Sequence, residues 1–474
     1  MDASTWSQEE FGNAALGDKR RTERLKSMAR GLAERPGGKM TRVFEFGADL
    51  EGAYRFLENP DVSVDELERA RGEACAKRLP GGKVAIIPLD QTTIALPEHS
   101  GTKMFGSVGC RRSGARGVHA ITALSLDEEG VVLGVLCQTR WLRSETVSPY
   151  RRRGYGKRND RRPAEQRESF YWIRTLDGCD AQLRQHAPDV RPWYQADQGA
   201  DFWRVFAWAH DHGVLLTARI GHERVISNRG HENYLHPWIA DRPVAFRYDL
   251  KLPERVGHNA RAARTAHLSV RFGTTTFQFA TTTRRRLPLT LSVVAVTEPR
   301  PPRGVEPIDW LLLTTHAVGT EEDAKLVLHN YTLRWRTEEF HRTLKTGACD
   351  IEASELESFE AFSRLLIIAS SVAARIERIK FLSRTQPDAP AAVAYSNEEI
   401  EMMLRLRRLR MVRNQPAPHP DRLPLHLMTR WMAELGGYRP SRGRGPPGTI
   451  VLTRGMAFLE AAVLGAEAAR GPPR

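Results

Sequence analysis

The sequence predicts an α/β protein: a mixed β-sheet flanked by helices, interrupted by a strand-rich insertion and bounded by helical segments at both ends. Three observations support this fold class. An uninterrupted apolar run at 84–89 has the length and composition of a buried strand. Residues 223 to about 315 lose helical periodicity and contain several strand-like segments. Apolar residues recur at helical spacing near both termini.

The elements follow in order along the chain. Residues 1 to about 62 are expected to be helical, with a break at Gly37-Gly38. Strands are then expected at 84–89, 117–126, 131–137, 190–196 and 214–218, and helices at 164–183 and 202–212. Within the insertion, strands are expected at 244–248, 266–272, 275–280, 289–296 and 310–314. The chain is expected to be helical again after Glu321, through 331–345, and then at 356–381. A capping box at Ser396 to Glu399 starts a further helix, and a last one covers 456–469.

Composition restricts the class of protein. The chain has 474 residues, enough for two or three domains, and its net charge of +14 indicates a polyanionic partner. Its five cysteines contain no CxxC pair, so neither a disulfide framework nor a zinc site is expected. We find no signal peptide, and the uninterrupted apolar runs are too short for a membrane span. The sequence therefore predicts a soluble, cytoplasmic protein.

The segment 331–345 carries an unusual polar stripe. Tyr331, Arg334, Glu338 and Lys345 have offsets of 0, 3, 7 and 14. At about 100° per residue they fall near 0°, 300°, 340° and 320° on a helix, within roughly 60° of one another. A carboxylate beside fixed cations suits a metal ion and the phosphates that it polarises. The alternative interpretation is a solvated charged face.

Two aspartates complete a plausible set of ligands for hard cations. Asp90 and Asp197 each follow a candidate strand, which would bring both to the carboxyl edge of one sheet. Together with Glu338 they offer the oxygen ligands that magnesium prefers, and two such ions suit phosphodiester chemistry. For each aspartate alone, the alternative is a turn former or helix cap.

The same stretches resemble a known family. The Y-x2-R-x3-E-x6-K pattern formed by the stripe residues is similar to the signature of bacterial insertion-sequence transposases with an RNase H-like, DDE catalytic core. The likeness is to the hairpin-forming, cut-and-paste branch that includes the transposase of the kanamycin-resistance composite transposon. It covers nearly the whole chain. The segments that resemble the family are 14–22, 51–60, Asp90-x-Thr92-Thr93, Asp197-x3-Asp201, 338–341 and 435–438.

The resemblance implies a fold, a chemistry and partners. The sheet would be RNase H-like, and Asp90, Asp197 and Glu338 would be catalytic residues that bind two Mg²⁺ ions, with Mn²⁺ able to substitute. The reactions would be nicking of the transposon end, hairpin formation, hairpin resolution and strand transfer. The partners would be double-stranded DNA at terminal inverted repeats, target DNA and a second subunit in a synaptic homodimer, without a membrane.

Further residues are implied as DNA contacts. Tyr331, Arg334 and Lys345 would hold phosphates, and Arg219 would lie near the scissile phosphate unless it is an ordinary surface arginine. Trp310 would hold a flipped base, with a place in the core of a strand as the alternative. For Trp335, packing against DNA or the core remains open. Basic residues of the first segment, which include Arg20, Arg21 and Arg24, would bind DNA unless they only form the exposed face of a helical cap.

The implied domains are an N-terminal helical DNA-binding domain at 1–62, an RNase H-like catalytic domain at 63–384 and a C-terminal helical dimerisation domain at 385–474. The catalytic domain would contain a β-insertion at about 223–315. A basic loop at 151–162 would contact the DNA backbone, or else remain a solvated loop. Two other functions stay open: a catalytically silent DNA-binding inhibitor of transposition, and an RNase H-like nuclease that cuts but never joins DNA.

Overall fold

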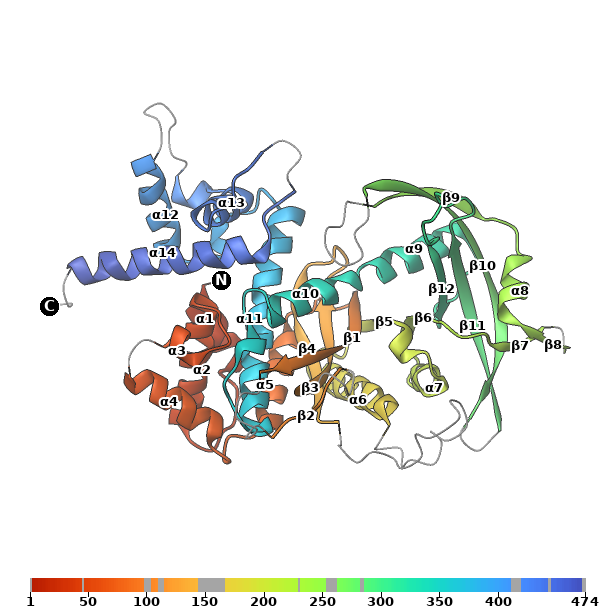
Figure 1. Cartoon of the computed structure of the whole chain (residues 1–474), viewed down its shortest axis with the longest axis horizontal. Coiled ribbons are helices and arrows are strands. Elements are labelled where there is room, and N and C mark those ends of the chain that lie inside the picture. The colour runs from red at the N-terminus through yellow and green to blue at the C-terminus, as the bar shows by residue number, and fades with distance from the viewer. Residues whose placement is uncertain are drawn as a thin grey trace.

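The computed structural model describes residues 2–44, 47–97, 104–109, 115–143, 167–228, 231–252, 262–281, 285–410, 419–441 and 445–470. In these residues the chain is a mixed α/β protein with a twelve-stranded mixed sheet and helices at both ends of the chain, which confirms the predicted α/β class. Figure 1 shows the N-terminal and C-terminal helices gathered at one end of the molecule and the later strands at the other. The predicted basic loop at 151–162 lies outside the described residues.

The N-terminal segment is helical, as predicted. Its helices are α1 (Ala3–Phe11), α2 (Lys19–Glu34), α3 (Met40–Val43) and α4 (Gly47–Glu58), and α5 (Val64–Lys77) follows them. Aspartates begin the first two helices: Asp2 accepts a hydrogen bond from the Thr5 backbone N–H at 2.9 Å, and Asp18 accepts one from that of Arg20 at 2.8 Å. One face of α2 is buried and its basic side chains lie on the other, so the helix is amphipathic.

The first part of the sheet consists of β1 (Val84–Leu96), β2 (Gly106–Ser107), β3 (Arg116–Leu126), β4 (Val132–Trp141), β5 (Arg191–Ala196) and β6 (Leu215–Arg219). Strands β1, β3 and β4 pair antiparallel, whereas β1, β5 and β6 run parallel. Successive residues of β1 face opposite sides, so Ile86 and Ile87 belong to different hydrophobic cores. The sheet therefore separates two layers of helices.

The second part of the sheet is antiparallel and comes from the insertion. Its strands are β7 (Val225–Asn228), β8 (His231–Tyr234), β9 (Phe246–Leu252), β10 (Arg264–Ala280), β11 (Arg286–Thr297) and β12 (Asp309–Thr314), and helix α8 (Leu235–Ala240) lies among them. Strand β12 pairs with β6, which makes the two parts one continuous sheet. The two strands expected at 266–272 and 275–280 are one strand, because Gly273 and Thr274 keep their pairing with Val293 and Ser292.

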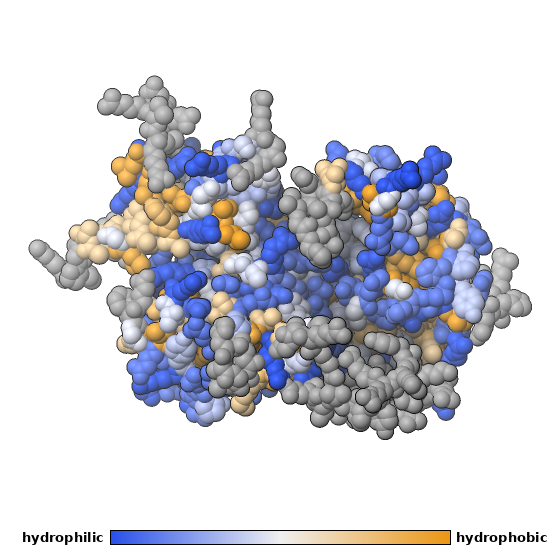
Figure 2. All heavy atoms as spheres, viewed as in Figure 1, coloured by the Kyte–Doolittle hydropathy of each residue, from blue (hydrophilic) through white to orange (hydrophobic). Residues whose placement is uncertain are grey.

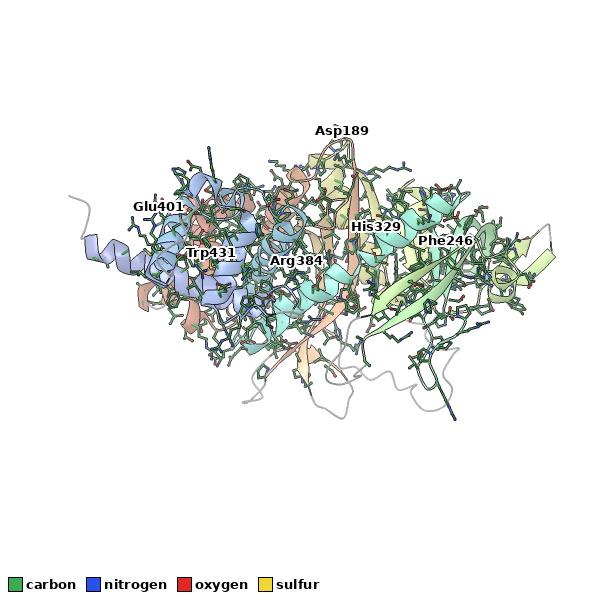
Figure 3. The ribbon with its side chains drawn as sticks, turned by 90° about the horizontal axis from the view of Figure 1, so that it is seen from above. Asp189, Phe246, His329, Arg384, Glu401 and Trp431 are labelled. Carbon is green, nitrogen blue, oxygen red and sulfur yellow. The ribbon has the colours of Figure 1, made fainter. Side chains whose placement is uncertain are left out.

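Different helices cover the two faces of the sheet. One face carries α6 (Glu168–His186), the 3₁₀ turn η4 (Gln198–Ala200) and α7 (Trp203–Asp211); the other carries α9 (Glu321–Thr332), α10 (Trp335–Lys345), the 3₁₀ turn η5 (Ile351–Ala353) and α11 (Phe359–Thr385). The prediction of one continuous helix through 331–345 is wrong, because the helical backbone is interrupted at Leu333–Arg334, between α9 and α10. Figure 3 shows α9, marked by His329, passing beside the strand that carries Phe246.

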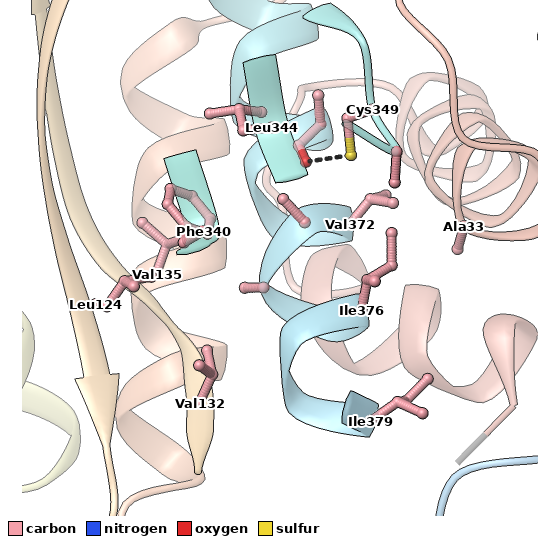
Figure 4. Packing of buried hydrophobic residues seen from close by; sticks show 14 of the residues in the cluster. Ala33, Leu124, Val132, Val135, Phe340, Leu344, Cys349, Val372, Ile376 and Ile379 are labelled. Atoms are coloured by element: carbon pink, nitrogen blue, oxygen red, sulfur yellow. Dashed lines mark hydrogen bonds between the residues drawn. The ribbon is translucent and has the colours of Figure 1, made fainter. Parts of the chain in front are cut away.

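Helix α11 forms the centre of the larger core. Its long buried surface contacts α10, the sheet and the N-terminal helices, and Figure 4 shows Phe340 of α10 next to Val135 of the sheet on one side of α11, with Val372 and Ile376 on the other. The Cys349 thiol donates a hydrogen bond of 3.6 Å to the Ala369 carbonyl. Because α11 contacts both α10 and the N-terminal helices, it fixes the position of the first helices relative to the sheet.

The C-terminal segment contains the 3₁₀ turns η6 (Ala391–Val393) and η7 (Pro420–Arg422) and the helices α12 (Asn397–Arg410), α13 (Leu425–Leu435) and α14 (Thr449–Arg470). The predicted capping box is confirmed: Ser396 and Glu399 exchange backbone-to-side-chain hydrogen bonds of 2.7 and 3.1 Å. Helices α13 and α14 cross at glycines, since a Cβ atom at Gly455 would lie 1.7 Å from the Met432 carbonyl oxygen. Trp431 and Glu401 mark this end of the molecule in Figure 3.

Within the described residues, α14 alone has a stretch long and apolar enough to cross a membrane by length and composition, at Thr449–Ala466. The sequence analysis did not find this stretch because it considered only uninterrupted apolar runs, and polar residues interrupt this one. Figure 2 shows pale-orange atoms along the projecting end of this helix. Length and composition are weak support for a span, since helices of soluble proteins meet the same criterion. The predicted cytoplasmic location stays a prediction.

The contact between α14 and α2 should depend on pH. Glu460 of α14 faces the carboxylates of Glu34 and Glu399, and burial together with this repulsion raises its pKa to about 7. A folded chain that binds this proton more tightly than the unfolded chain loses stability as pH rises from about 4.5 to about 7. Glu460→Gln should therefore raise the free energy of unfolding at pH 8 by about 1 kcal/mol, a value that allows for partial exposure.

Urea denaturation of the full chain at pH 5.5 and pH 8 measures this effect. Glu401→Gln, on the exposed side of α12, is the matched control and should leave the pH dependence unchanged. An equal pH dependence in wild type and Glu460→Gln would contradict the prediction.

Candidate active site

Asp90 and Asp197 lie on neighbouring parallel strands. The pairing of β1 with β5 ends at Leu89 opposite Ala196, so the two aspartates take the next position on each strand. The sequence suggested that Asp90 follows the end of its strand. In the structure β1 instead continues to Leu96, and beyond Leu89 it pairs with β3 alone. The expected approach of the two carboxylates at one edge of the parallel strands is nevertheless observed, and they interact electrostatically.

The Asp197 carboxylate also caps a turn. It accepts a hydrogen bond of 2.8 Å from the Gly199 backbone N–H at the start of η4, so the alternative role considered for this residue is present as well. Burial, the nearby Asp90 and Glu338 raise the pKa of Asp197, although the Gly199 bond and Arg334 lower it. Burial first, and the neighbouring carboxylates second, therefore disfavour the charged form of Asp197 in the folded protein.

Glu338 of α10 is linked to Asp90 by Arg334, which forms an ion pair with each of them. One guanidinium nitrogen of Arg334 lies 3.6 Å from Asp90 Oδ1, and the other donates to Glu338 Oε1 at 3.1 Å. The Arg334 side chain is 13% exposed, so its charge is largely withdrawn from water. Its nearness to Tyr331, Asp90 and Glu338 raises its pKa against the opposing effect of burial. Arg334 is thus the cation that holds the acidic cluster together.

The break between α9 and α10 positions Arg334. The backbone N–H groups of Arg334, Arg336 and Thr337 donate to carbonyls three residues earlier, each at 3.0 Å, which tightens the chain into a 3₁₀-like turn. A regular helix was expected here because the 3.6-residue periodicity of the side chains continues across the turn. Since Arg334 begins α10 and Glu338 follows one turn later, the pair still shares one face, as the stripe predicted.

Two polar side chains that the sequence analysis did not select also contact Asp90. Thr337 Oγ1 donates to Asp90 Oδ2 at 3.4 Å, and His341 Nδ1 lies 3.5 Å from the same oxygen. His341 is 7% exposed, and its Nε2 is buried without a hydrogen-bond partner among the described residues. At about 100° per residue His341 falls near 280°, beside the predicted stripe, so the helical pattern contained a signal for it.

Tyr331, Arg219 and Trp310 form the adjoining wall of the site. Tyr331 is buried, which raises its pKa, and it interacts with Arg334, Arg219 and Asp197. Arg219 ends β6 and donates from Nη2 to the Asp309 carbonyl at 3.3 Å. The half-buried Trp310 packs edge-on to Tyr331, with ring centroids 6.4 Å apart. The structure therefore places Arg219 and Trp310 beside Tyr331, which itself interacts with Asp197.

Lys345 lines a pocket on the other side of Glu338. This open pocket of about 350 Å³ contains polar side chains from β1, α10 and η5: Asp90, Gln91, Thr92, Glu338, His341, Arg342, Lys345, Thr346 and Glu352. Lys345 forms an ion pair of 3.2 Å with Glu352, which also accepts a hydrogen bond from the Ala95 backbone N–H. Lys345 thus belongs to the site but is separated from Asp197, which does not line this pocket.

Trp335 and Glu339 are two residues of α10 that lie outside the core and outside the carboxylate cluster, respectively. The Trp335 side chain is 52% exposed, so it is not a core residue. Glu339 forms ion pairs of 3.2 Å with Arg336 and 3.3 Å with Lys380, outside the cluster around Asp90. Of the two adjacent glutamates, only Glu338 faces the site.

The cluster can hold a divalent cation only after a change in its charge balance. In the described part of the chain no three acidic, histidine or cysteine side chains already form a metal-binding group. Arg334 instead supplies the positive charge between Asp90 and Glu338. Burial, and after it the charges of Asp90 and Glu338, raise the pKa of Asp197, so the three carboxylates interact electrostatically.

The predicted DNA-contacting arginines of the N-terminal helices differ in their surroundings. Arg20 is 92% exposed, and its one ion pair among the described residues is with the neighbouring Asp18, at 3.1 Å. Arg21 instead reaches the Leu16 carbonyl and Asp61, and Arg24 pairs with Asp49 at 3.0 Å. Arg21 and Arg24 therefore also connect parts of the helical segment, whereas Arg20 projects into solvent.

The fold joins a basic helical module to an α/β unit that carries clustered carboxylates and cations. Residues 3–62 match the family model described as a transposase DNA-binding domain. This N-terminal match supports a transposase that binds DNA, and it covers α1 to α4 and the three arginines.

Arg20 provides a test of this DNA-binding role. Arg20→Gln should weaken binding of duplex DNA to a similar extent for all sequences, because an exposed arginine that contacts phosphate neutralises charge without reading bases. The slope of log K against log salt concentration should fall in magnitude by about 1, measured by fluorescence anisotropy at several salt concentrations. Arg430→Gln, which removes an exposed arginine of α13 outside the N-terminal segment, should leave the slope unaltered. An unchanged slope for Arg20→Gln would exclude this contact.

Proposed function

We propose that the protein is a Mg²⁺-dependent DDE transposase that moves DNA by cut-and-paste transposition. Asp90, Asp197 and Glu338 would be its catalytic carboxylates. The observation that carries the proposal is the meeting of these three residues, from two parallel strands and one helix, around Arg334. They lie 107 positions or more apart in sequence (197 − 90 = 107 and 338 − 197 = 141), so local structure cannot account for their meeting.

The strand arrangement supports an RNase H-like core. Strands β4, β3 and β1 form an antiparallel meander, and β5 and β6 continue parallel to β1, with helices on both faces. In such a sheet, ligands bind near the carboxyl ends of the parallel strands, where Asp90, Asp197 and Arg219 lie. The strands β7 to β12 between Asp197 and Glu338 agree with an inserted β-subdomain.

Each residue of the site has a role in this proposal. Asp90, Asp197 and Glu338 would hold two Mg²⁺ ions, with Mn²⁺ as an alternative. When bound, the ions would supply an activated attacking oxygen and stabilise charge on the departing one. Arg334 would turn from the carboxylates toward a phosphate, and Tyr331, Arg219 and Lys345 would hold the neighbouring phosphates. Trp310 would provide the aromatic surface for a base flipped during hairpin formation.

The proposed reaction is a series of phosphoryl transfers at transposon ends. Water would nick one strand, the freed 3′-hydroxyl would attack the opposite strand to form a hairpin, water would open the hairpin, and the 3′ ends would join target DNA. A homodimer would bridge two ends in a synaptic complex, and the C-terminal helices α12 to α14 would contribute to its assembly. The protein would act in the cytoplasm, at the nucleoid.

An assay with linear DNA that carries candidate terminal repeats tests the function. With Mg²⁺, the full-length protein should release flank-free ends closed as hairpins and then join them to a target plasmid. Glu338→Gln should bind the same DNA within about twofold but should not cut it. Binding without cleavage by the wild type would favour the inhibitor, whereas cleavage without joining would favour the nuclease. Either result would overturn the proposal.

A further inference from the structure

The pocket beside Glu338 contains a carboxylate to which the proposed reaction gives no role. Glu352 lies in the 3₁₀ turn η5 and lines this pocket together with Asp90, Glu338 and Lys345. The side chains of Glu352 and Lys345 are both half-buried, so water screens their charges only in part. A carboxylate at this place repels the phosphates that Lys345 is proposed to hold, so Glu352 needs a role that offsets the repulsion.

Glu352 holds the Lys345 ammonium group at the pocket. Its Oε1 lies 3.2 Å from Lys345 Nζ and also accepts a hydrogen bond of 3.2 Å from the Ala95 backbone N–H. Ala95 belongs to β1, the strand that contains Asp90. A lysine side chain is long and flexible, so an ammonium group without a partner would occupy many positions. Glu352 therefore connects Lys345 of α10 to the strand of Asp90.

The backbone before Glu352 has an unusual conformation. Among the residues that the structure describes, Asp350 is the only non-glycine residue with a positive φ, at 43°. This left-handed conformation is unfavourable for most residues and persists where the surrounding contacts hold it, often at functional sites. Because η5 begins at the next residue, the turn at Asp350 sets the path of the chain that presents Glu352 to Lys345.

The N-terminal module packs on the same turn. A Cβ atom at Gly38 would collide with the Asp350 carbonyl oxygen, so only glycine allows this close approach. The next residue, Lys39, forms an ion pair with Glu355. The segment 350–355 therefore contacts both the module that matches transposase DNA-binding domains and, through Glu352, the lysine of the candidate site.

We propose that Glu352 is a positioning residue for Lys345. An ammonium group has three donors, so Lys345 binds a DNA phosphate while it keeps its contact with Glu352. One carboxylate then has two opposite effects. Glu352 weakens DNA binding, because it competes with phosphate for Lys345, and it speeds cleavage, because it keeps Lys345 directed into the pocket. This role rests on the proposed function, in which Lys345 holds a phosphate.

A double-mutant cycle in DNA binding tests the competition. Fluorescence anisotropy at low salt, in EDTA, measures binding of duplex DNA that ends in candidate terminal repeats. Glu352→Gln, whose amide oxygen can still accept both hydrogen bonds, should bind about twofold to fivefold more tightly than wild type. In the Lys345→Gln background the same change should have a smaller effect, since only direct repulsion between Glu352 and DNA remains. An effect there as large as in wild type would overturn the proposal, and so would an unchanged affinity of Glu352→Gln.

Cleavage kinetics at saturating DNA with Mg²⁺ test the positioning. Glu352→Gln should cut within about twofold of the wild-type rate, because it retains the contacts of Glu352. Glu352→Ala loses the contacts with Lys345 and with the Ala95 N–H, so it should cut about tenfold more slowly. Equal rates for the two variants would contradict a positioning role. Glu355→Gln is the matched control: it removes a charge from the same segment, but the partner of Glu355 is Lys39, so its effect on affinity should be the same with and without Lys345.

The outcomes separate this role of Glu352 from the proposed function. If the wild type never cuts DNA, the proposed function is wrong, yet the binding cycle in EDTA still measures the coupling between Glu352 and Lys345. If the wild type cuts and joins DNA but that coupling is absent, only the role of Glu352 is wrong. Thermal unfolding of each variant, expected within about 2 °C of the wild type, ensures that folded proteins are compared.

Discussion

Replacing Asp197 by asparagine is expected to abolish cleavage of transposon-end DNA while leaving the protein as stable as the wild type or more stable. The amide keeps the turn at Gly199, because its oxygen still accepts that hydrogen bond. It removes a negative charge held near Asp90 and Glu338, whose repulsion together with burial raises the pKa of Asp197. The cleavage rate should fall about 10³-fold, equivalent to about 4 kcal/mol, because a carboxylate ligand of the proposed ions is lost.

The matched control is Asp201→Asn, four positions further along the same loop. Asp201 pairs with Arg224 and accepts a hydrogen bond of 3.0 Å from the Gly221 backbone N–H, and its side chain is 2% exposed. Its replacement should lower the free energy of unfolding by about 1–3 kcal/mol, since a charged hydrogen bond is weakened in a buried place. Cleavage per folded molecule should persist. If Asp197→Asn cuts DNA as fast as the wild type, Asp197 is not catalytic.

Arg334→Met is expected to destabilise the protein strongly and to make its stability depend on divalent cations. Arg334 balances the 12% exposed Asp90 and the partly exposed Glu338, so its loss should cost about 2–4 kcal/mol in the presence of EDTA. Mg²⁺ should recover part of this loss by replacing the missing positive charge, and its effect should be larger than on the wild type. Urea denaturation with EDTA and with Mg²⁺ measures both quantities.

Arg336→Met is a suitable control for this experiment. Arg336 lies two residues away, donates to the Gly130 carbonyl at 3.1 Å and pairs with Glu339 at 3.2 Å, away from Asp90. It should lose stability as well, but Mg²⁺ should affect it no more than the wild type. An equal response of the two variants to Mg²⁺ would show that the carboxylates around Arg334 do not share a cation.

Local sequence patterns predicted much of the structure because they depend on neighbouring residues. The capping box at Ser396 follows from a hydroxyl and a carboxylate three positions apart, and Arg334 with Glu338 follows from one turn of helix. The approach of Asp90 and Asp197 could also be predicted from the sequence, because the pairing of two parallel strands ends at the same edge of the sheet. Periodicity, strand length and capping chemistry are sufficient for these features.

Other features depend on contacts between distant segments and were not predicted. The break before Trp335 arises from tight backbone hydrogen bonds that leave the side-chain periodicity nearly unchanged. Gly273 suggested the end of a strand, yet pairing with Val293 keeps β10 continuous. Neither Thr337 nor His341 was selected, because their role depends on the position of Asp90 in another part of the chain.

The pairing of β12 with β6 has a mechanical consequence. Backbone pairing sets Leu312 opposite Arg219, so the strand that carries Trp310 is joined directly to the strand that ends in Arg219. If the proposed function is correct, a movement of Trp310 relative to Arg219 would have to break this pairing, and we expect the DNA duplex to bear most of the distortion needed for hairpin closure.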